Sequence, residues 1–348
     1  MREFGVVLVG RSNDAPAVLS AKEVIVSVLP PYLLLVVGVL LRRFGVLKKE
    51  HDAGIMQVAF QVLYPCLILD KILGRDGLGS FGGVIGTVSI GFLLPVGSIA
   101  IGWLTGRIIG LEKGTGRRTF ALSSGLQNFG YTAIPVVRQL WGDIALPTLF
   151  VHNLGVELAV WSVGVMLLSG SNTIAWRKLV NGPVFAVVVA LLLVATGVDK
   201  WFTPSTAEAS VSQYYFAFPL RKTISMLGDG AFPVAIMLTG AIMVDLVRTE
   251  RPSLKVIAAG SLVRLVMAPM LILCVAKFLP LGVHLKQVLV VQAAMPAAMT
   301  PILLARLYGG RAGIAVQIVV ATTVLSLLTL PWIISWGSVW LGLKAGLP

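Results

Sequence analysis

Ten apolar stretches, each close to the length of a membrane-spanning helix, run through this chain. The hydrocarbon core of a bilayer is crossed by about 20 mainly apolar residues in helical form. The stretches lie near residues 24–41, 54–73, 81–106, 117–140, 144–169, 179–197, 219–243, 254–279, 285–307 and 312–337. The sequence therefore predicts an all-α polytopic membrane protein with ten transmembrane helices.

Composition and the placement of charge argue against a soluble domain and against a nucleic-acid partner. Hydrophobic residues make up 57% of the chain and charged residues 12%, whereas a soluble domain usually carries about twice that charged fraction. The net charge is +13, but the Lys and Arg residues lie mostly in short loops between apolar stretches. Cys66 and Cys274 fall inside such stretches and indicate no disulfide framework. A lipid bilayer is the expected surrounding.

The ten stretches divide into two repeats of five. An odd number of spans in each repeat gives the halves opposite orientations, which is typical of inverted-repeat transporters. Span four and span nine also resemble each other, because each has a mid-span proline and ends in Leu-aromatic-Gly. The expected units are an N-terminal tail (1–23), the first repeat with the start of the second (24–197), an extracellular or periplasmic connection (198–218), the rest of the second repeat (219–337) and a C-terminal tail (338–348).

Loop charges predict the orientation of the chain. An even number of spans places both termini on the same side of the membrane. Most loop cations lie between an odd-numbered span and the next even-numbered one: Arg42, Arg43, Lys48, Lys49, Arg107, Lys113, Arg117, Arg118, Arg177, Lys178, Arg248, Arg251, Lys255, Arg306 and Arg311. The positive-inside rule then predicts a plasma (inner) membrane protein with both termini outside. Asp70-Lys71 closes span two and is interpreted as a solvated end.

Prolines in the middle of spans four and nine predict broken helices. Pro135, Pro296 and Pro301 each lack a backbone donor and clash with the preceding turn. In lipid, a broken helix is tolerated only where it is buried or lines a cavity. Each break also creates a half-helix N-terminus that suits an anion. Two such breaks in corresponding spans predict a crossing near the midplane that binds substrate; the alternative is that the prolines only kink their helices.

Polar residues beside these prolines are the predicted substrate-binding residues. They are Gln127, Asn128, Gln292 and Thr300. An amide such as that of Asn128 can donate to a carboxylate without bringing a charge into the membrane. The alternative is that this amide satisfies the backbone of the break.

Ionisable and polar residues inside other spans are candidates for ion coupling or gating. Asn153 and Glu157 are four residues apart on span five and share a helix face, beside His152. An intramembrane acid indicates function by default, as a site for a proton or a cation, or else a structural contact. Asp229 lies between two glycines. It is interpreted either as a functional acid or as a structural helix cap. Arg264 is expected to pair with Glu157 or Asp229, or to attract an anion.

Motifs of enzymes are absent from the sequence. It contains no Walker motif, HExxH, CxxC or GxSxG, and its three histidines are scattered. No cofactor or metal site is expected, and transport has to run on an ion gradient or simply equilibrate the substrate. If an ion gradient drives transport, H⁺ and Na⁺ are the two candidate coupling ions.

Several motifs, in order, resemble those of the auxin efflux carrier family, which includes plant carriers and bacterial permeases. The segment from Gln127 to Val137 is similar to the family's crossover segment, and Val291 to Tyr308 resembles its Gln-Ala-Ala-hydrophobic-Pro segment with an Ala-basic-x-Tyr end. Arg264 to Pro269, Ile224 to Ala231 and Arg177 to Pro183 resemble three further family elements. The resemblance covers about residues 24–340.

This resemblance implies the fold of the bile-acid/sodium symporters. Spans 1, 2, 6 and 7 would form a scaffold, spans 3–5 and 8–10 a mobile unit that carries the substrate as an elevator, and the scaffold a homodimer. It also implies a small organic anion as substrate. Gln127 stands where plant carriers have proline, and Val184 where they have a polar substrate contact. These departures favour a carboxylate other than auxin.

Three functions are consistent with these features. The first is a carrier that moves a small organic anion by alternating access. The second is a sodium- or proton-coupled symporter on the same fold, which predicts uptake that depends on Glu157. The third is a membrane receptor that binds an anion without moving it; an intramembrane enzyme is the remotest option.

Overall fold

The computed structural model describes residues 21–74, 81–130, 132–170, 181–202, 213–247 and 252–343, and its regular elements there are helices. Most of the predicted tail 1–23, half of the connection 198–218 and several loop cations lie outside these ranges. The helices are α1 (Ala21–Arg43), α2 (Asp52–Val58), α3 (Tyr64–Ile72), α4 (Phe81–Ile108), α5 (Thr115–Gly125), α6 (Ala133–Trp141), α7 (Leu146–Ala159), α8 (Val165–Ser169), α10 (Gly182–Ala195), α11 (Asp199–Phe202), α12 (Phe218–Asp229), α13 (Ala231–Val247), α14 (Leu254–Leu262), α15 (Ala268–Phe278), α16 (Val283–Ala294), α17 (Thr300–Leu307) and α18 (Ala312–Leu341).

Short π-helical turns join several of these helices into longer runs. They are η2 (Ala59–Leu63) between α2 and α3, η5 (Val160–Gly164) between α7 and α8, η6 (Gln213–Ala217) before α12, and η7 (Val263–Met267) between α14 and α15. A 3₁₀ turn, η4 (Gly142–Ala145), leads from α6 into α7. Such π turns insert a residue without ending the helix, so the apolar stretches stay continuous.

Seven helical runs in the described residues are long and apolar enough to cross a membrane. This confirms an all-α, multi-pass membrane protein. The number differs from the ten predicted spans for two reasons. The stretches 117–140 and 285–307 are each divided into two short helices, and α10 has only 14 residues.

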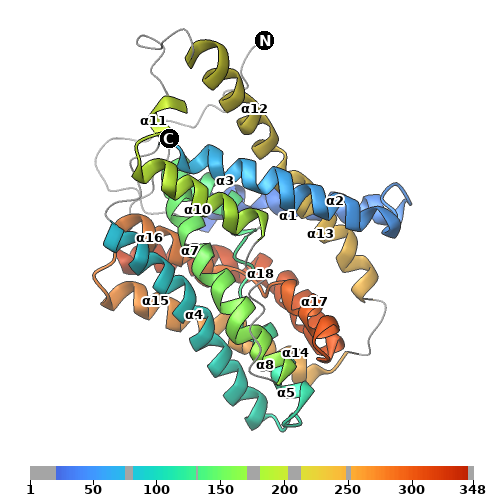
Figure 1. Cartoon of the computed structure of the whole chain (residues 1–348). Helices are drawn as coiled ribbons and strands as arrows, with labels where there is room; N and C mark the ends of the chain where they lie inside the picture. Colours follow the sequence, from blue (N-terminus) through green and yellow to red (C-terminus); the bar gives the residue numbers. More distant parts are fainter. Residues whose placement is uncertain are drawn as a thin grey trace.

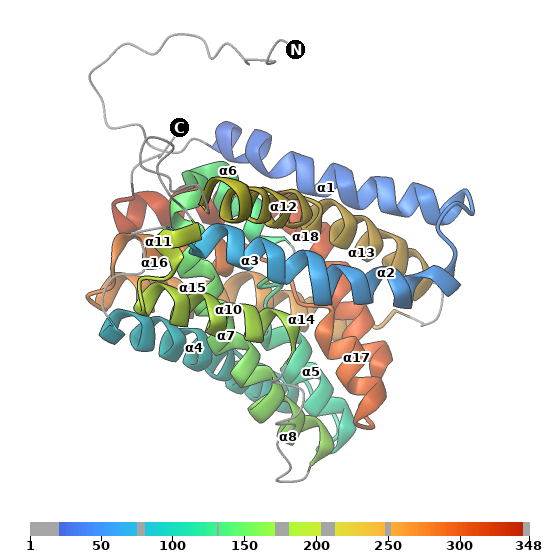
Figure 2. The same cartoon turned by 45° about the horizontal axis from the view of Figure 1, so that its top comes forward.

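The helices form two packed groups (Figures 1 and 2). α1, α2, α3, α12 and α13 lie together in the upper part of both views, and α4, α5 and α8 lie in the lower part. In the upper group α1 packs on α13, and α4 of the lower group packs on α7. Glycines allow both approaches: a Cβ at Gly240 would lie 2.0 Å from the carbonyl oxygen of Leu35, and one at Gly155 would lie 2.0 Å from that of Val88. Small residues at helix contacts are typical of membrane proteins, because backbones can then approach closely.

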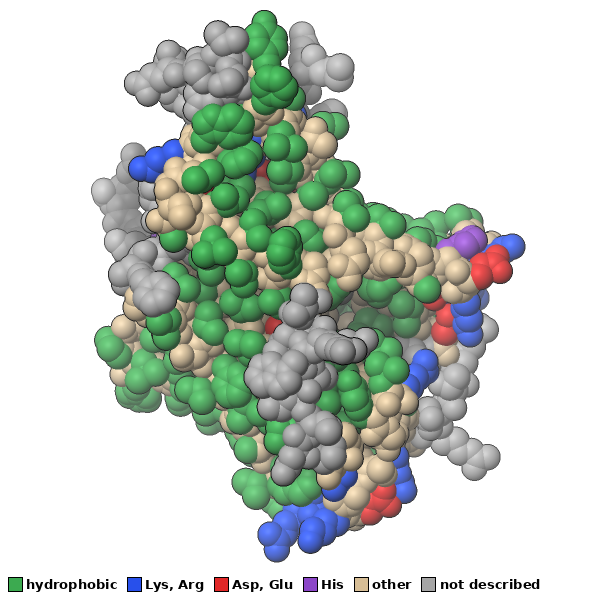
Figure 3. Space-filling view, viewed as in Figure 1, with side chains coloured by type: hydrophobic (Ala, Val, Ile, Leu, Met, Phe, Trp, Pro, Cys, Tyr) green, Lys and Arg blue, Asp and Glu red, His purple; other side chains and the backbone are tan. Residues whose placement is uncertain are grey.

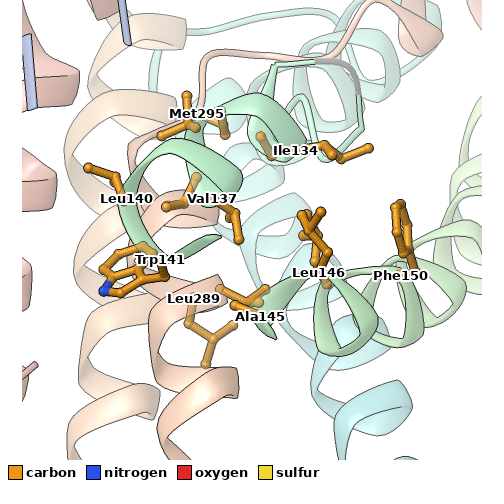
Figure 4. Packing of buried hydrophobic residues seen from close by; sticks show 14 of the residues in the cluster. Ile134, Val137, Leu140, Trp141, Ala145, Leu146, Phe150, Leu289 and Met295 are labelled. Atoms are coloured by element: carbon orange, nitrogen blue, oxygen red, sulfur yellow. The ribbon is translucent and has the colours of Figure 1, made fainter. Parts of the chain in front are cut away.

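A buried apolar cluster fixes the position of α6, the short helix after the first break (Figure 4). Ile134, Val137 and Leu140 of α6 are 0–1% exposed, and Figure 4 shows them in one cluster with Leu289, Met295 and Leu146 of α7. Because α6 has only nine residues, it depends on this packing for stability.

The outer surface is mainly apolar. Figure 3 shows hydrophobic side chains over most of the visible face, with Lys and Arg mostly at its lower and right-hand edges. Exposed large hydrophobic residues lie on the outer faces of several helices: Val26, Leu33, Phe216, Met226, Met270, Leu328 and Trp332. Lipid is the solvent that suits such a surface.

Candidate functional site

Two chain breaks meet at the centre of the molecule. The first separates α5 from α6 and the second separates α16 from α17. The breaks pair as an isolated antiparallel bridge between Gln127 and Ala297. The Asn128 amide donates to the Pro296 carbonyl at 2.8 Å, and the Ala298 amide donates to that of Leu126 at 3.0 Å. We call residues 126–132 and 295–299, with residue 131 outside the described part, the crossing.

The predicted prolines lie at the crossing, but they act differently from mid-helix kinks. Pro135 lies in the first turn of α6 and Pro301 in the first turn of α17, where a missing N–H costs no helical hydrogen bond. Pro296 lies inside the second break. The prolines therefore help to start the second half of each helix, and each of the two stretches is divided beside them.

Amide side chains hold the first break in place. The Asn153 side chain on α7 donates to the Phe129 carbonyl at 2.9 Å, and Gln292 on α16 donates to the same carbonyl at 3.2 Å. Gln292 also donates to the Asn153 side-chain oxygen at 3.2 Å, and His152 lies 3.4 Å from that oxygen. Asn153 and Gln292, taken from different spans of the sequence, thus bind one carbonyl of the broken backbone.

Two further side chains satisfy backbone groups that the breaks leave free. Arg264 on η7 is 0% exposed and donates to the Gly125 carbonyl, at the end of α5, at 3.1 Å. A cation at a helix C-terminus is favourable because the helix dipole is negative there. Thr322 on α18 accepts a hydrogen bond from the Ala297 amide at 3.1 Å.

A small cavity lies on one side of the crossing. Asn128, Thr132 and Pro296 line it from the crossing, and Tyr32 of α1 and Thr239 of α13 line it from the other helix group. Its volume is about 10 Å³, which is room for about one water molecule. The Asn128 side chain donates to the Thr132 hydroxyl at 2.9 Å. An organic anion needs the two groups to move apart before it can enter.

The other predicted substrate residues lie away from this cavity. Gln127 is 1% exposed, with no hydrogen-bond partner at either amide atom. Gln292 is buried in the amide network behind the break. Thr300 is the first residue of α17 and is half-buried. Among the four predicted residues, Asn128 alone lines the described cavity.

The predicted pairing of Arg264 with an acid is wrong within the described residues. Glu157 accepts a hydrogen bond from Trp161 at 2.7 Å, one turn along the same chain segment. Asp229 has a 55% exposed side chain and lies 3.6 Å from Arg138. Arg264 instead binds the end of α5. The reason is that broken backbone offers it a carbonyl acceptor, which sequence spacing does not reveal.

Asp70 and Lys71 belong to a buried charged cluster, so the prediction of a solvated end is also wrong. The Lys71 ammonium lies 2.8 Å from Asp70 and 3.0 Å from Asp143. Arg138 lies 3.1 Å from Asp143, and Arg221 lies 3.5 Å from Asp70. Lys71 is 5% exposed and Asp70 7%. With Asp229, these residues form what we call the charged cluster, which joins α3 and α12 to α6 and η4.

Sequence reasoning missed the half of the cavity that α1, α13 and α18 provide. Tyr32, Thr239 and Thr323 line it but come from spans without a predicted break. Pro30-Pro31 directly before Tyr32 is the one local signal, and two adjacent prolines are too common in membrane helices to identify a site.

Comparison with known proteins agrees with this architecture. The chain matches the family described as membrane transport protein over residues 23–175 and again over residues 165–334. A match in two successive parts suggests a repeat. An uncharacterized transporter of Methanothermobacter thermautotrophicus (strain Delta H) is 24% identical over 326 residues, which cover 90% of this chain and 97% of that protein. The chain belongs to the membrane transport protein family, that of the auxin efflux carriers, and is a transporter rather than an enzyme.

Proposed function

We propose that this protein is a secondary transporter that moves a small organic anion by alternating access. The observation that carries the proposal is the crossing itself, in which two broken helices place Asn128 and the start of α6 beside a central cavity. The partial positive charge of a helix N-terminus and a neutral amide donor suit a carboxylate. No nucleotide-binding motif is present in the sequence, so the driving force is an ion gradient or the substrate gradient.

The lining of the cavity favours a substrate with one carboxylate. The residues that line it include no Lys and no Arg, and many are apolar, such as Leu35, Ile236 and Met299. A second carboxylate would lie in this apolar part without a partner, and burying an unpaired charge is unfavourable. A monocarboxylate with an apolar body fits better than a dicarboxylate.

The proposed architecture is a ten-span inverted repeat of five plus five that works as an elevator. Spans 1, 2, 6 and 7 form the scaffold, and spans 3–5 and 8–10 form the mobile unit. Ion pairs support this division. Arg42–Asp52 and Arg42–Asp245, at 2.6 and 3.2 Å, lie within the proposed scaffold. The pair Glu112–Arg311, at 2.8 Å, lies within the proposed mobile unit.

Only part of the charged cluster joins the two proposed units. Lys71 and Asp229 belong to the scaffold, whereas Arg138 and Asp143 belong to the mobile unit. Their contacts, Lys71–Asp143 at 3.0 Å and Arg138–Asp229 at 3.6 Å, have to break if the mobile unit slides along the scaffold. We further propose a homodimer through the scaffold in the plasma (inner) membrane, with both termini outside. The loop cations support this orientation.

Replacing Asn128 with alanine is expected to reduce uptake strongly while leaving the fold intact. Among the described residues, its side chain donates only to Thr132, so its loss leaves one hydroxyl acceptor and little strain. The backbone bond from Asn128 to Pro296 is kept. A hydrogen bond to a charged group contributes about 1.5–3 kcal/mol, which predicts a loss of about tenfold or more in substrate affinity.

The measurement is uptake into proteoliposomes across a panel of radiolabelled monocarboxylates and dicarboxylates. Gln57→Ala, on α2 with an exposed side chain outside the cavity, serves as the amide control and is expected to keep wild-type uptake. Saturable binding without flux in the wild-type protein would support a receptor instead. Unchanged flux in Asn128→Ala would remove this residue from the site.

A cation-coupled symporter is the second candidate, and the amide network supports it. The side-chain oxygen of Gln292 is buried with no hydrogen-bond donor, beside the Phe129 carbonyl and Asn153. Amide and carbonyl oxygens are ligands of hard cations. The same proteoliposomes, loaded with and without sodium and proton gradients, test this. Coupling at Glu157 requires that the gradient dependence be lost in Glu157→Gln, whereas coupling at the network requires that it be lost in Gln292→Leu.

A further inference from the structure

The hydroxyl and amide groups that line the cavity differ in their acceptors: some donate to a backbone carbonyl and others to a side chain. Thr239 donates to the Ala235 carbonyl at 2.9 Å, and Thr323 donates to the Val319 carbonyl at 2.7 Å. These hydroxyls therefore bind the backbone of their own helices. Asn128 and Tyr32 instead donate to side chains, which can turn away without breaking a helix.

The hydrogen bonds of Ser326 show whether Tyr32 is the donor or the acceptor in the bond between them. The Tyr32 hydroxyl lies 2.8 Å from the Ser326 hydroxyl on α18. Ser326 gives its own hydrogen to the Thr323 carbonyl at 2.7 Å. Because a hydroxyl has one hydrogen, Tyr32 is the donor and Ser326 the acceptor. Tyr32 is 8% exposed and Ser326 is 0% exposed, so bulk water has little access to this bond.

A carboxylate is a stronger acceptor than a serine hydroxyl. Hydrogen bonds to an ionised group are roughly twice as strong as those between neutral groups. An anion that enters the cavity between Asn128 and Tyr32 would therefore draw the Tyr32 hydrogen away from Ser326. The cost is a neutral hydrogen bond between α1 and α18, which lie in different proposed units.

We propose that Tyr32 is a substrate-binding residue that donates from the scaffold to the carboxylate, opposite Asn128 on the mobile unit. This inference rests on the proposed function and deepens it. One carboxylate oxygen accepts from Asn128 and the other from Tyr32. Binding releases the Tyr32–Ser326 hydrogen bond, so the substrate replaces a direct link between the two units. Two neutral donors also select an acceptor-only head group, and they reject the amide analogue of the same acid.

The test uses the full-length protein in proteoliposomes, with a radiolabelled monocarboxylate that the wild-type protein takes up. Tyr32→Phe is expected to raise KM by about tenfold with Vmax within about twofold, because one hydrogen bond to the charged group is lost. Tyr308→Phe is the matched control: Tyr308 is half-buried after α17 but does not line the cavity. It is expected to keep the wild-type KM.

Ser326→Ala separates substrate binding from a structural role of the hydrogen bond. It frees Tyr32 from its acceptor, so KM is expected to stay unchanged or to fall. A rise in KM equal to that of Tyr32→Phe would show that the link between α1 and α18 matters and would overturn the proposal. This variant is informative even if Tyr32→Phe fails to reconstitute.

The outcomes distinguish failure of the proposed transport function from failure of the proposed role of Tyr32. If the wild-type protein takes up no carboxylate of the panel, the proposed function fails and Tyr32 loses its role with it. If the wild-type protein transports an acid and Tyr32→Phe keeps the wild-type KM, only the role of Tyr32 fails. Competition by the amide analogue as strong as by the acid itself would also overturn it.

Discussion

Replacing Gly91 with alanine is expected to destabilise the protein by about 2–3 kcal/mol, within the range typical of overpacked cores. A Cβ at this position of α4 would lie 2.1 Å from the carbonyl oxygen of His152 on α7. Because that atom belongs to the backbone, no side chain can rotate away, and α4 and α7 have to separate. The measurement is the free energy of unfolding in mixed detergent micelles.

The same substitution is expected to reduce transport, because α7 positions the crossing. His152 precedes Asn153, which donates to the Phe129 carbonyl at 2.9 Å and accepts from Gln292 at 3.2 Å. The displacement of α7 that relieves this overlap is expected to lengthen both bonds. Uptake should therefore fall by more than the loss of folded protein accounts for.

Gly86→Ala is the matched control on the same helix. A Cβ there meets no atom within 4 Å, and alanine is favoured over glycine in a helix by about 0.5–1 kcal/mol. This variant is expected to be as stable as the wild-type protein or slightly more so. Equal destabilisation by Gly86→Ala and Gly91→Ala would contradict the close contact between α4 and α7.

Sequence patterns predicted the parts of this fold that lipid dictates. Twenty-residue apolar stretches and mid-span prolines follow from hydrocarbon thickness and from the lack of water in the bilayer. The breaks therefore lie where Pro135 and Pro296 indicated, and Asn128 lies at the cavity. These features are local, since each depends on residues within one span.

Contacts between spans could not be predicted in the same way. Arg264 finds the carbonyl of Gly125, 139 residues away, because a broken helix exposes an acceptor that no charge pattern shows. Tyr32 and Ser326 are 294 residues apart, and neither stands out in an apolar span. Lys71 has the appearance of a solvated helix end in sequence because its partner Asp143 lies in a later loop. Each of these roles depends on contacts that form only when spans distant in the sequence pack together.

Replacing Lys71 with methionine is expected to destabilise the protein by about 2–4 kcal/mol, because the buried carboxylate of Asp70 and that of Asp143 each lose a close counter-charge. Its ammonium lies 2.8 Å from Asp70 and 3.0 Å from Asp143, and its side chain is 6% exposed. Methionine keeps most of the apolar stem of lysine. The loss of stability therefore comes from the missing charge rather than from a change in side-chain volume. Arg221 and Arg138 remain near the two carboxylates and keep the loss below that of an isolated pair.

Lys49→Met and a double variant test whether the loss of stability in Lys71→Met depends on the burial of its ion pairs. Lys49 has a 73% exposed side chain, 3.8 Å from Asp245, and exposed pairs contribute about 0–1 kcal/mol. Equal effects of Lys49→Met and Lys71→Met would mean that the charged cluster is solvated. Asp143→Asn should cost less stability in the Lys71→Met background than alone, since the Lys71–Asp143 contact is already lost there, and the difference is the coupling energy of the pair. Because Lys71 and Asp143 belong to different proposed units, that coupling energy also measures how firmly the charged cluster holds the mobile unit against the scaffold.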